Sequence, residues 1–366
     1  MKSKRLASVD ALRGFDMLLI AGGGSFIYRL LEHSGWSWAD TILVQMAHIP
    51  WDGFTFWDFI MPLFLFISGV SMTFSLNKAL DMGMTKSEVL KKVLKRAFLL
   101  IILGIIYKNS PMNIFDPANI RYGSVLGRIG IAISATAILY LNFSWQKRLI
   151  WVAGILLAYY AAIFLIPVPG YGAGDLSKEG NLVAWFDQTF MPGRLLQGTF
   201  DQLALLTQIP ALCITVLGAW AGDILRKTDT KEMTKIKWLV IIGITTIGLG
   251  LLWGLHFPIN KRMWSSSFIL LTSGMSFLAL SLFYWLIDIK GYKKWAFFFV
   301  VIGVNSLFIY YAFRFIDFYH SSNLLFSGIY GIAAEKWHPA IEAFGALMLV
   351  WILLYFLYKK KIFFKV

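Results

Sequence analysis

Cysteine is almost absent from this sequence, since Cys213 is the single example in 366 residues. A disulfide within the chain is therefore excluded, and so is a metal site built from cysteine thiolates. Cys213 lies in an apolar run, where a lone cysteine usually serves packing. The sequence also lacks both common phosphate-binding glycine motifs, G-x-x-x-x-G-K-[ST] and G-x-G-x-x-G.

Charge is scarce as well, and one sign dominates. Only 15% of residues are charged and 58% are hydrophobic, whereas soluble domains carry about a quarter charged residues. With a mean hydropathy of +0.66, this composition predicts a polytopic membrane protein. The net charge of +14 raises nucleic acid as a partner, but the positions of the basic residues favour loops that face a cytoplasm instead.

The apolar residues fall into about ten runs, each near the ~20 residues that a helix needs to cross a bilayer. The first run follows the basic residues 2–5, as in a signal peptide. It is too long for one and carries Asp10, Arg13 and Asp16, which favours a retained helix. We predict an all-α polytopic fold forming a single domain, residues 1–366, that rests in a lipid bilayer. The predicted spans are 9–31, 54–77, 89–107, 122–142, 147–167, 203–225, 237–256, 265–287, 295–317 and 340–358.

The basic residues alternate between the two sides of these spans. With the N-terminus inside, 23 Lys and Arg residues fall in inside loops and 8 in outside loops, and the other three lie within spans. Because cytoplasmic loops are enriched in Lys and Arg, both termini are predicted to be cytoplasmic and His48 to lie outside.

Residues 45–69 join titratable side chains to one of the long apolar runs. His48 has the side chain best matched to general-base work near neutral pH, and either Asp52 or Asp58 is close enough in sequence to orient its ring. Trp51 stands beside them as a candidate substrate contact. The alternative interpretation is a polar loop and a helix cap, because Thr55-x-x-Asp58 fits a capping box.

Other charged groups point to an anionic ligand at the cytoplasmic side. Asp10 and Arg13 share one face of the first helix, and Arg128 lies inside a span, where a charge usually has a partner or a function. Lys92 and Arg96 belong to a basic run that would suit phosphates. The alternatives are a helix start with an interfacial arginine, a topology signal, and contact with anionic lipids.

Two further residues are candidates for substrate contact. Asn305 lies in the middle of a span, where its amide needs hydrogen-bond partners from a neighbouring helix or from substrate. Trp264, in the segment Asn260-Lys261-Arg262-Met263-Trp264, places an indole and charge near the outer surface. The long outer loops, 168–202 and 318–339, combine aromatic residues with carboxylates, which suits either sugar recognition or an interfacial aromatic belt.

Several of these segments together resemble the heparan-alpha-glucosaminide N-acetyltransferase family, within the wider transmembrane acyltransferases. The matching pieces are Ser8-Val9-Asp10-Ala11-Leu12-Arg13-Gly14, His48-x-x-Trp51-x-Gly53 with Asp58 and Pro62, Leu126-Gly127-Arg128-Ile129-Gly130, Phe257-Pro258-Ile259-Asn260-Lys261-x-x-Trp264-Ser265-x-Ser267-Phe268, and Gly303-x-Asn305-Ser306.

The resemblance implies transfer of acetyl from cytoplasmic acetyl-CoA to the amine of a terminal glucosamine on the far side. It aligns His48 with the family's active-site histidine and Asp58 with an acidic residue ten positions later. Ile20-Ala21 stand where the lysosomal enzyme has an asparagine before its glycine run. We expect a bacterial-type member, without a lumenal domain, in the inner membrane.

From the sequence we therefore predict an acetyl-CoA-dependent N-acetyltransferase that uses no metal and binds no nucleic acid. A homodimer is compatible with the sequence. Direct transfer and an acetyl-histidine relay both remain open, as do the alternatives of glycan O-acetylation and transport of an anionic or sugar-linked solute. The residues assigned to catalysis are His48 and Asp58, those assigned to the acceptor are Trp51, Asp52, Trp264 and Asn305, and those assigned to acetyl-CoA are Asp10, Arg13, Arg128, Lys92 and Arg96.

Overall fold

The structure is a computed structural model that describes residues 6–364, and within this range it contains helices and no β-strand. The first half comprises α1 (Ala7–Leu18), η1 (Leu19–Gly23), α2 (Gly24–Glu32), α3 (Ala39–Gln45), α4 (Phe56–Asp81), α5 (Lys86–Lys108), η2 (Pro117–Asn119), α6 (Val125–Asn142) and α7 (Trp145–Leu165). The second half comprises α8 (Leu182–Phe190), α9 (Gln208–Arg226), α10 (Glu232–Gly254), α11 (Ser266–Phe283), η3 (Tyr284–Ile289), α12 (Lys293–Gly303), α13 (Ser306–Phe315), α14 (Phe318–Tyr330), η4 (Glu335–Trp337) and α15 (His338–Lys359).

The predicted all-α polytopic architecture is confirmed. Among the described residues, eight helical segments are long and apolar enough to cross a membrane, and the bent pair α12–α13 makes nine if it forms one span. The expected count of about ten included α5. That helix is long enough, but the basic run that contains Lys91, Lys92, Lys95 and Arg96 leaves too short an apolar stretch.

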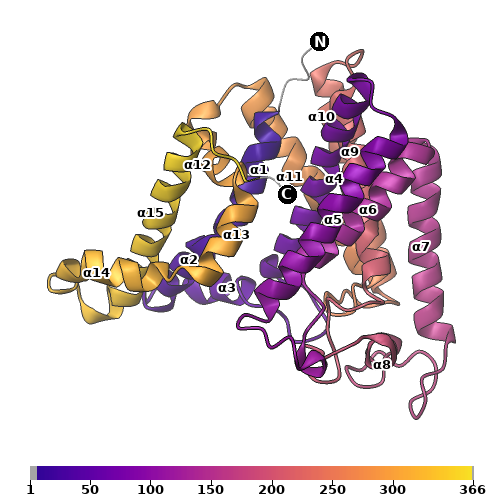
Figure 1. Cartoon of the computed structure of the whole chain (residues 1–366), viewed down its shortest axis with the longest axis horizontal. Coiled ribbons are helices and arrows are strands. Elements are labelled where there is room, and N and C mark those ends of the chain that lie inside the picture. Colours follow the sequence, from indigo (N-terminus) through magenta and orange to yellow (C-terminus); the bar gives the residue numbers. More distant parts are fainter. Residues whose placement is uncertain (1–5, 365–366) are drawn as a thin grey trace.

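The helices pack as a bundle with two recognisable ends (Figure 1). The terminal end holds the first turn of α1 and the last turn of α15. The loop end holds α3, α8 and α14 together with the long connections around residues 109–124 and 166–207. Within the bundle α1 packs on α12, α4 on α9, α5 on α6, and α10 on α11.

Glycine allows the central pair, α4 and α9, to approach closely. A Cβ atom added at Gly69 would lie 2.1 Å from the carbonyl oxygen of Thr215, and one at Gly218 would lie 2.1 Å from that of Phe66. Small residues permit such contact between membrane helices, where van der Waals packing rather than the hydrophobic effect holds helices together. The closeness of α4 and α9 therefore depends on these two positions.

The first membrane segment is broken in its middle. Between α1 and α2 the π-helical turn η1 contains Ala21 and Gly22 outside helical geometry, and Gly22 has a φ of +99°. The break thus falls at the start of the run Gly22-Gly23-Gly24. Such π-bulges occur frequently at functional sites.

Candidate active site

His48 and Asp58 are hydrogen bonded to each other at the loop end of the bundle. The Nδ1 atom of His48 lies 2.7 Å from Oδ1 of Asp58. The histidine side chain is 40% exposed and the aspartate side chain 2%. Asp58 lies in the first turn of α4, where its Oδ2 atom accepts a hydrogen bond from the backbone N–H of Thr55 at 3.3 Å. The predicted capping box is present, so one carboxylate both caps α4 and holds the imidazole.

Lys261 completes this group, and the sequence analysis did not assign it to the site. Its Nζ atom lies 3.2 Å from Oδ1 of Asp58 and 3.2 Å from Nδ1 of His48. Burial of the ammonium lowers the pKa of Lys261 to about 8, and the nearby carboxylate of Asp58 limits this fall. In the sequence, only the position of Lys261 beside Asn260, in the segment near the outer surface, could have indicated a role in the site.

Asp52 lies close by but does not contact the imidazole. Its Oδ1 atom accepts a hydrogen bond from Nδ2 of Asn260 at 3.0 Å, and the N–H of Gly53 donates to the carbonyl of Ile259 at 2.8 Å. These bonds fasten the segment after His48 to the segment before Lys261. Of the two carboxylates considered as orienting groups, Asp58 is thus the one that meets the ring.

A cavity of about 690 Å³ extends from this group into the bundle. One face of α4 lines it from Trp57 to Leu76, at the three- and four-residue spacing of a helix face. The helix rises about 28 Å between these two residues, which is close to the ~30 Å thickness of a bilayer's hydrocarbon core. The cavity therefore follows nearly a whole membrane span.

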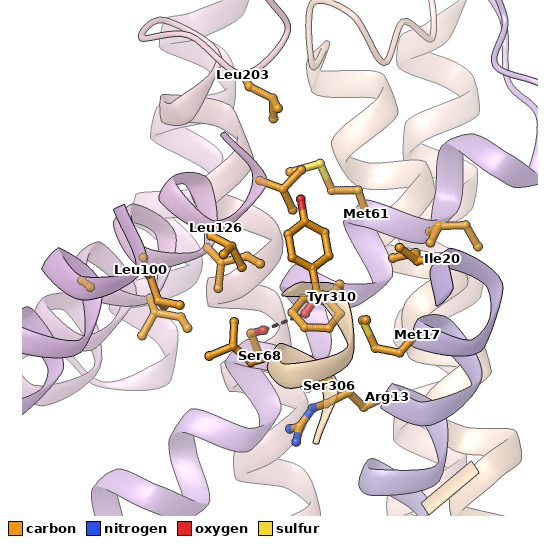
Figure 2. A pocket seen from close by; sticks show the side chains of 18 of the residues that line it. Arg13, Met17, Ile20, Met61, Ser68, Leu100, Leu126, Leu203, Ser306 and Tyr310 are labelled. Carbon is orange, nitrogen blue, oxygen red and sulfur yellow. Dashed lines mark hydrogen bonds between the residues drawn. The ribbon is translucent and has the colours of Figure 1, made fainter. Parts of the chain in front are cut away.

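The wall of this cavity changes character along its length. Figure 2 shows Arg13 at one end and Leu203 at the other, with Met17 and Ile20 facing Leu100 and Leu126 across the space. Toward the terminal end the α4 face turns polar, because Ser68, Ser71 and Ser75 line the cavity there.

Two arginines line the terminal part of the cavity. Arg13 donates a hydrogen bond to the hydroxyl of Ser71, and its Nη1 atom lies 3.7 Å from Oδ1 of Asp10, so the predicted pairing across one helix turn is present. Arg96 reaches the same cavity from α5. Three of the residues predicted to bind acetyl-CoA therefore lie at the terminal end, opposite His48: Asp10, Arg13 and Arg96.

Arg128 lies elsewhere, in the first turns of α6 near the loop end. It is fully buried, its Nε atom donates to Oε1 of Gln208 at 3.1 Å, and its guanidinium lies 4.3 Å from the centre of the Trp264 ring. Trp264 is fully buried in turn. Arg128 and Trp264, both predicted site residues, thus contact each other, and neither lines the cavity. Arg128 does not join Arg13 at the terminal end.

The remaining predicted contacts also engage protein groups. Asn305 donates to the carbonyl of Ile362 at 3.1 Å and accepts from the N–H of Phe364 at 3.0 Å, which fixes the segment after α15 beside the cavity. Trp51 donates from its indole N–H to the carbonyl of Leu176 at 2.8 Å. Lys92, at the surface of α5, lies outside the cavity lining.

No group of three or more His, Cys, Asp or Glu side chains suited to a metal ion occurs within residues 6–364. Fold and site together define a class: an integral membrane protein of the helical, polytopic kind, with a His–Asp–Lys group at one end of a cavity that follows a membrane span.

The comparisons with known proteins place the chain within that class. The family model described as heparan-alpha-glucosaminide N-acetyltransferase, catalytic, matches residues 5–258, and the chain belongs to this family. The proteins named heparan-alpha-glucosaminide N-acetyltransferase from Mus musculus and Homo sapiens are 28% and 27% identical to it, over 100% and 99% of this chain. The chain spans about three fifths of their length, 61% and 60% respectively.

Proposed function

We propose that this protein is an acetyltransferase that moves acetyl from acetyl-CoA to the amine of an amino sugar. The observation that carries the proposal is the single cavity that joins two arginines at one end to His48 and Lys261, the two partners of the buried Asp58, at the other. Family membership supports the reaction type. The alternating Lys/Arg bias supports entry of acetyl-CoA from the cytoplasm and of the acceptor from the opposite side.

Arg13 and Arg96 are suited to hold the phosphates of acetyl-CoA at the terminal end, since guanidinium groups match phosphate oxygens geometrically. The serine hydroxyls of α4 are suited to the two amides of the pantetheine arm, because hydroxyls both donate and accept hydrogen bonds. The cavity then leads the thioester toward His48. Roles for Asp10, Lys92 and Arg128 in donor binding stay predictions.

His48 would act as the general base. With its Nδ1–H donated to Asp58, the ring carries its free lone pair on Nε2, which is the atom able to accept a proton from the amine. The amine nitrogen bonds to the acetyl carbon, the carbon–sulfur bond breaks, and the proton taken by His48 passes to the departing thiolate. A relay in which acetyl first bonds to the imidazole uses the same groups.

The test is acetyl transfer from labelled acetyl-CoA to a panel of amino sugars by the purified protein. His48→Ala should lose transfer by about 10²–10⁴-fold, the usual contribution of a general base, while still binding acetyl-CoA. His256→Ala, in the exposed turn after α10 and outside both cavities, is the matched control and should keep full activity. Near wild-type turnover in His48→Ala would show that this group is not the active site.

A transporter for an anionic or sugar-linked solute is the rival function, and the length of the cavity is the observation that favours it. The two are separated by the same assay. A protein that binds acetyl-CoA but neither hydrolyses it nor transfers acetyl to any amino sugar, while moving a labelled sugar across proteoliposome membranes, would replace the enzyme proposal.

A further inference from the structure

A second cavity, of about 410 Å³, lies beside the loop end of the first. It is open on one side and bordered by the broken first segment, the end of α3, the first turn of α4, and residues of α13 and α14. Its lining residues are Leu19, Ile20, Gly22, Gly24, Ser25, Tyr28, Arg29, Glu32, Met46, Trp57, Phe313 and Tyr319.

The two cavities share a wall. Ile20 and Trp57 line both of them, so these two side chains separate one space from the other. Met46 lines the second cavity and His48, two residues later, lines the first. A ligand in the second cavity would therefore lie one side chain away from the proposed base.

The break in the first segment shapes this wall. An added Cβ atom at Gly24 would lie 2.2 Å from the ring of Trp57, so the missing side chain is what allows the indole to lie against the helix. The left-handed backbone at Gly22 lets the segment change course at the same level, since glycine adopts positive φ without strain.

The second cavity combines aromatic faces with polar groups of both signs. Arg29 is held by Glu342 at 2.5 Å and lies 4.9 Å from the centre of the Tyr319 ring. Tyr28 and Glu32 are exposed at its edge. Aromatic faces suit the C–H surface of a sugar ring, hydroxyl groups need donors and acceptors, and a carboxylate attracts a protonated amine.

We propose that this second cavity binds the acceptor, a terminal hexosamine with a free amine. Trp57 and Ile20, the side chains that line both cavities, border the path by which this amine reaches the thioester. This inference rests on the proposed acetyltransferase function. The ammonium of the sugar is drawn to Glu32 and gives up one proton to water on leaving it. The neutral nitrogen then attacks the acetyl carbon and the carbon–sulfur bond breaks. The second proton of the nitrogen passes through His48 to the thiolate, and the products are the N-acetylated sugar and CoA.

The test uses the full-length protein, labelled acetyl-CoA and a disaccharide ending in glucosamine. Glu32→Gln removes the charge at the cavity edge without changing its shape, and it should raise KM for the sugar about 10-fold, as loss of a charge-assisted contact would. Ser25→Trp fills the cavity and should lower kcat/KM for the sugar about 100-fold, since small misplacements of a reactant have effects of that size. Both variants should bind acetyl-CoA as the wild type does.

Glu335→Gln is the matched control, because Glu335 is an exposed carboxylate at the same end of the bundle and outside both cavities. It should leave KM unchanged. If the wild type transfers acetyl while both Glu32→Gln and Ser25→Trp keep its KM for the sugar, the second cavity is not the acceptor site and the proposed function stands. If the wild type neither binds acetyl-CoA nor acetylates amino sugars, the proposed function falls, and this inference falls with it.

Discussion

At the scale of single residues, the three-way contact of His48, Asp58 and Lys261 is the feature that most constrains the chemistry. An imidazole beside a carboxylate alone would hold a proton strongly, because the carboxylate stabilises the imidazolium. Here the same carboxylate oxygen also meets an ammonium 3.2 Å away. The carboxylate of Asp58 therefore serves two partners at once, the imidazole of His48 and the ammonium of Lys261.

This arrangement predicts that Lys261→Met removes a change in transfer rate near pH 8, where the buried ammonium of the wild type loses its proton. In the variant no group titrates at this position, so the rate should show no step near pH 8. Arg262 is the other charged group that bears on Lys261, and it remains in the variant. The measurement is kcat/KM for acetyl transfer between pH 5 and 9.

Lys336→Met, which removes an exposed lysine at the same end of the bundle, is the control. A step near pH 8 that persists in Lys261→Met would mean that the lysine serves only to stabilise the fold. That outcome would instead show as a lower thermal midpoint with an unchanged profile, since a buried carboxylate that loses its partner destabilises a protein.

At the scale of elements, the α4–α9 crossing positions the site, because α4 carries both Asp58 and the wall of the cavity. Gly69→Ala should destabilise the protein by about 1–3 kcal/mol, the usual effect of overpacking, since the new methyl group would meet backbone of α9. Gly154→Ala on α7 has no atom within 4 Å of its new Cβ. It should be neutral or stabilising by up to ~1 kcal/mol. Thermal unfolding in detergent would measure both, and equal midpoints would contradict the packing argument.

The short helix α8 carries a pH-dependent contribution to stability. Burial raises the pKa of Asp187 to about 6, although the backbone N–H groups of Leu205 and Leu206 donate to it. A carboxyl whose pKa is raised on folding stabilises the native state while it is protonated, and that contribution is lost as pH rises from about 4 through 6. A shift of about two pH units corresponds to about 3 kcal/mol.

The thermal midpoint of the wild type should therefore fall between pH 4 and 6, and Asp187→Asn should lack this fall. Unfolding curves recorded in detergent at half-unit pH intervals would show this as a flatter dependence in the variant. The same slope in both proteins would mean that Asp187 is solvated in the native state.

Sequence patterns predicted the elements better than the contacts between them. Long apolar runs marked most of the membrane segments, and Thr55-x-x-Asp58 marked the start of α4, because both signals are local. Lys261 was missed as a site residue, since its contact with His48 joins positions 213 residues apart. Arg128 was assigned to acetyl-CoA because an intramembrane charge indicates a partner or a function. Its partners in the structure include Thr207, Gln208 and Trp264, which no local pattern reveals.

At the scale of the whole molecule, the orientation in the membrane stays a prediction of the Lys/Arg distribution. Single cysteines on the loop-end side should react with an impermeant thiol reagent added to intact cells, and those on the terminal-end side should not. Native Cys213 is buried and should not react with the reagent. The loop-end positions are Ser37, Glu179 and Ala334, and the terminal-end positions are Ser87, Thr228 and Tyr292, all exposed. Labelling in the reverse pattern would place acetyl-CoA entry on the opposite side.

A cavity that follows nearly a whole membrane span also raises the question of ion leakage across the membrane. Between the serines and His48 the wall is apolar, with Met61, Phe64 and Leu126 among its side chains. Narrow passages lined by apolar groups shed water, and channels use such constrictions as gates. We therefore expect this apolar stretch of the empty cavity to keep protons and ions from passing through the protein.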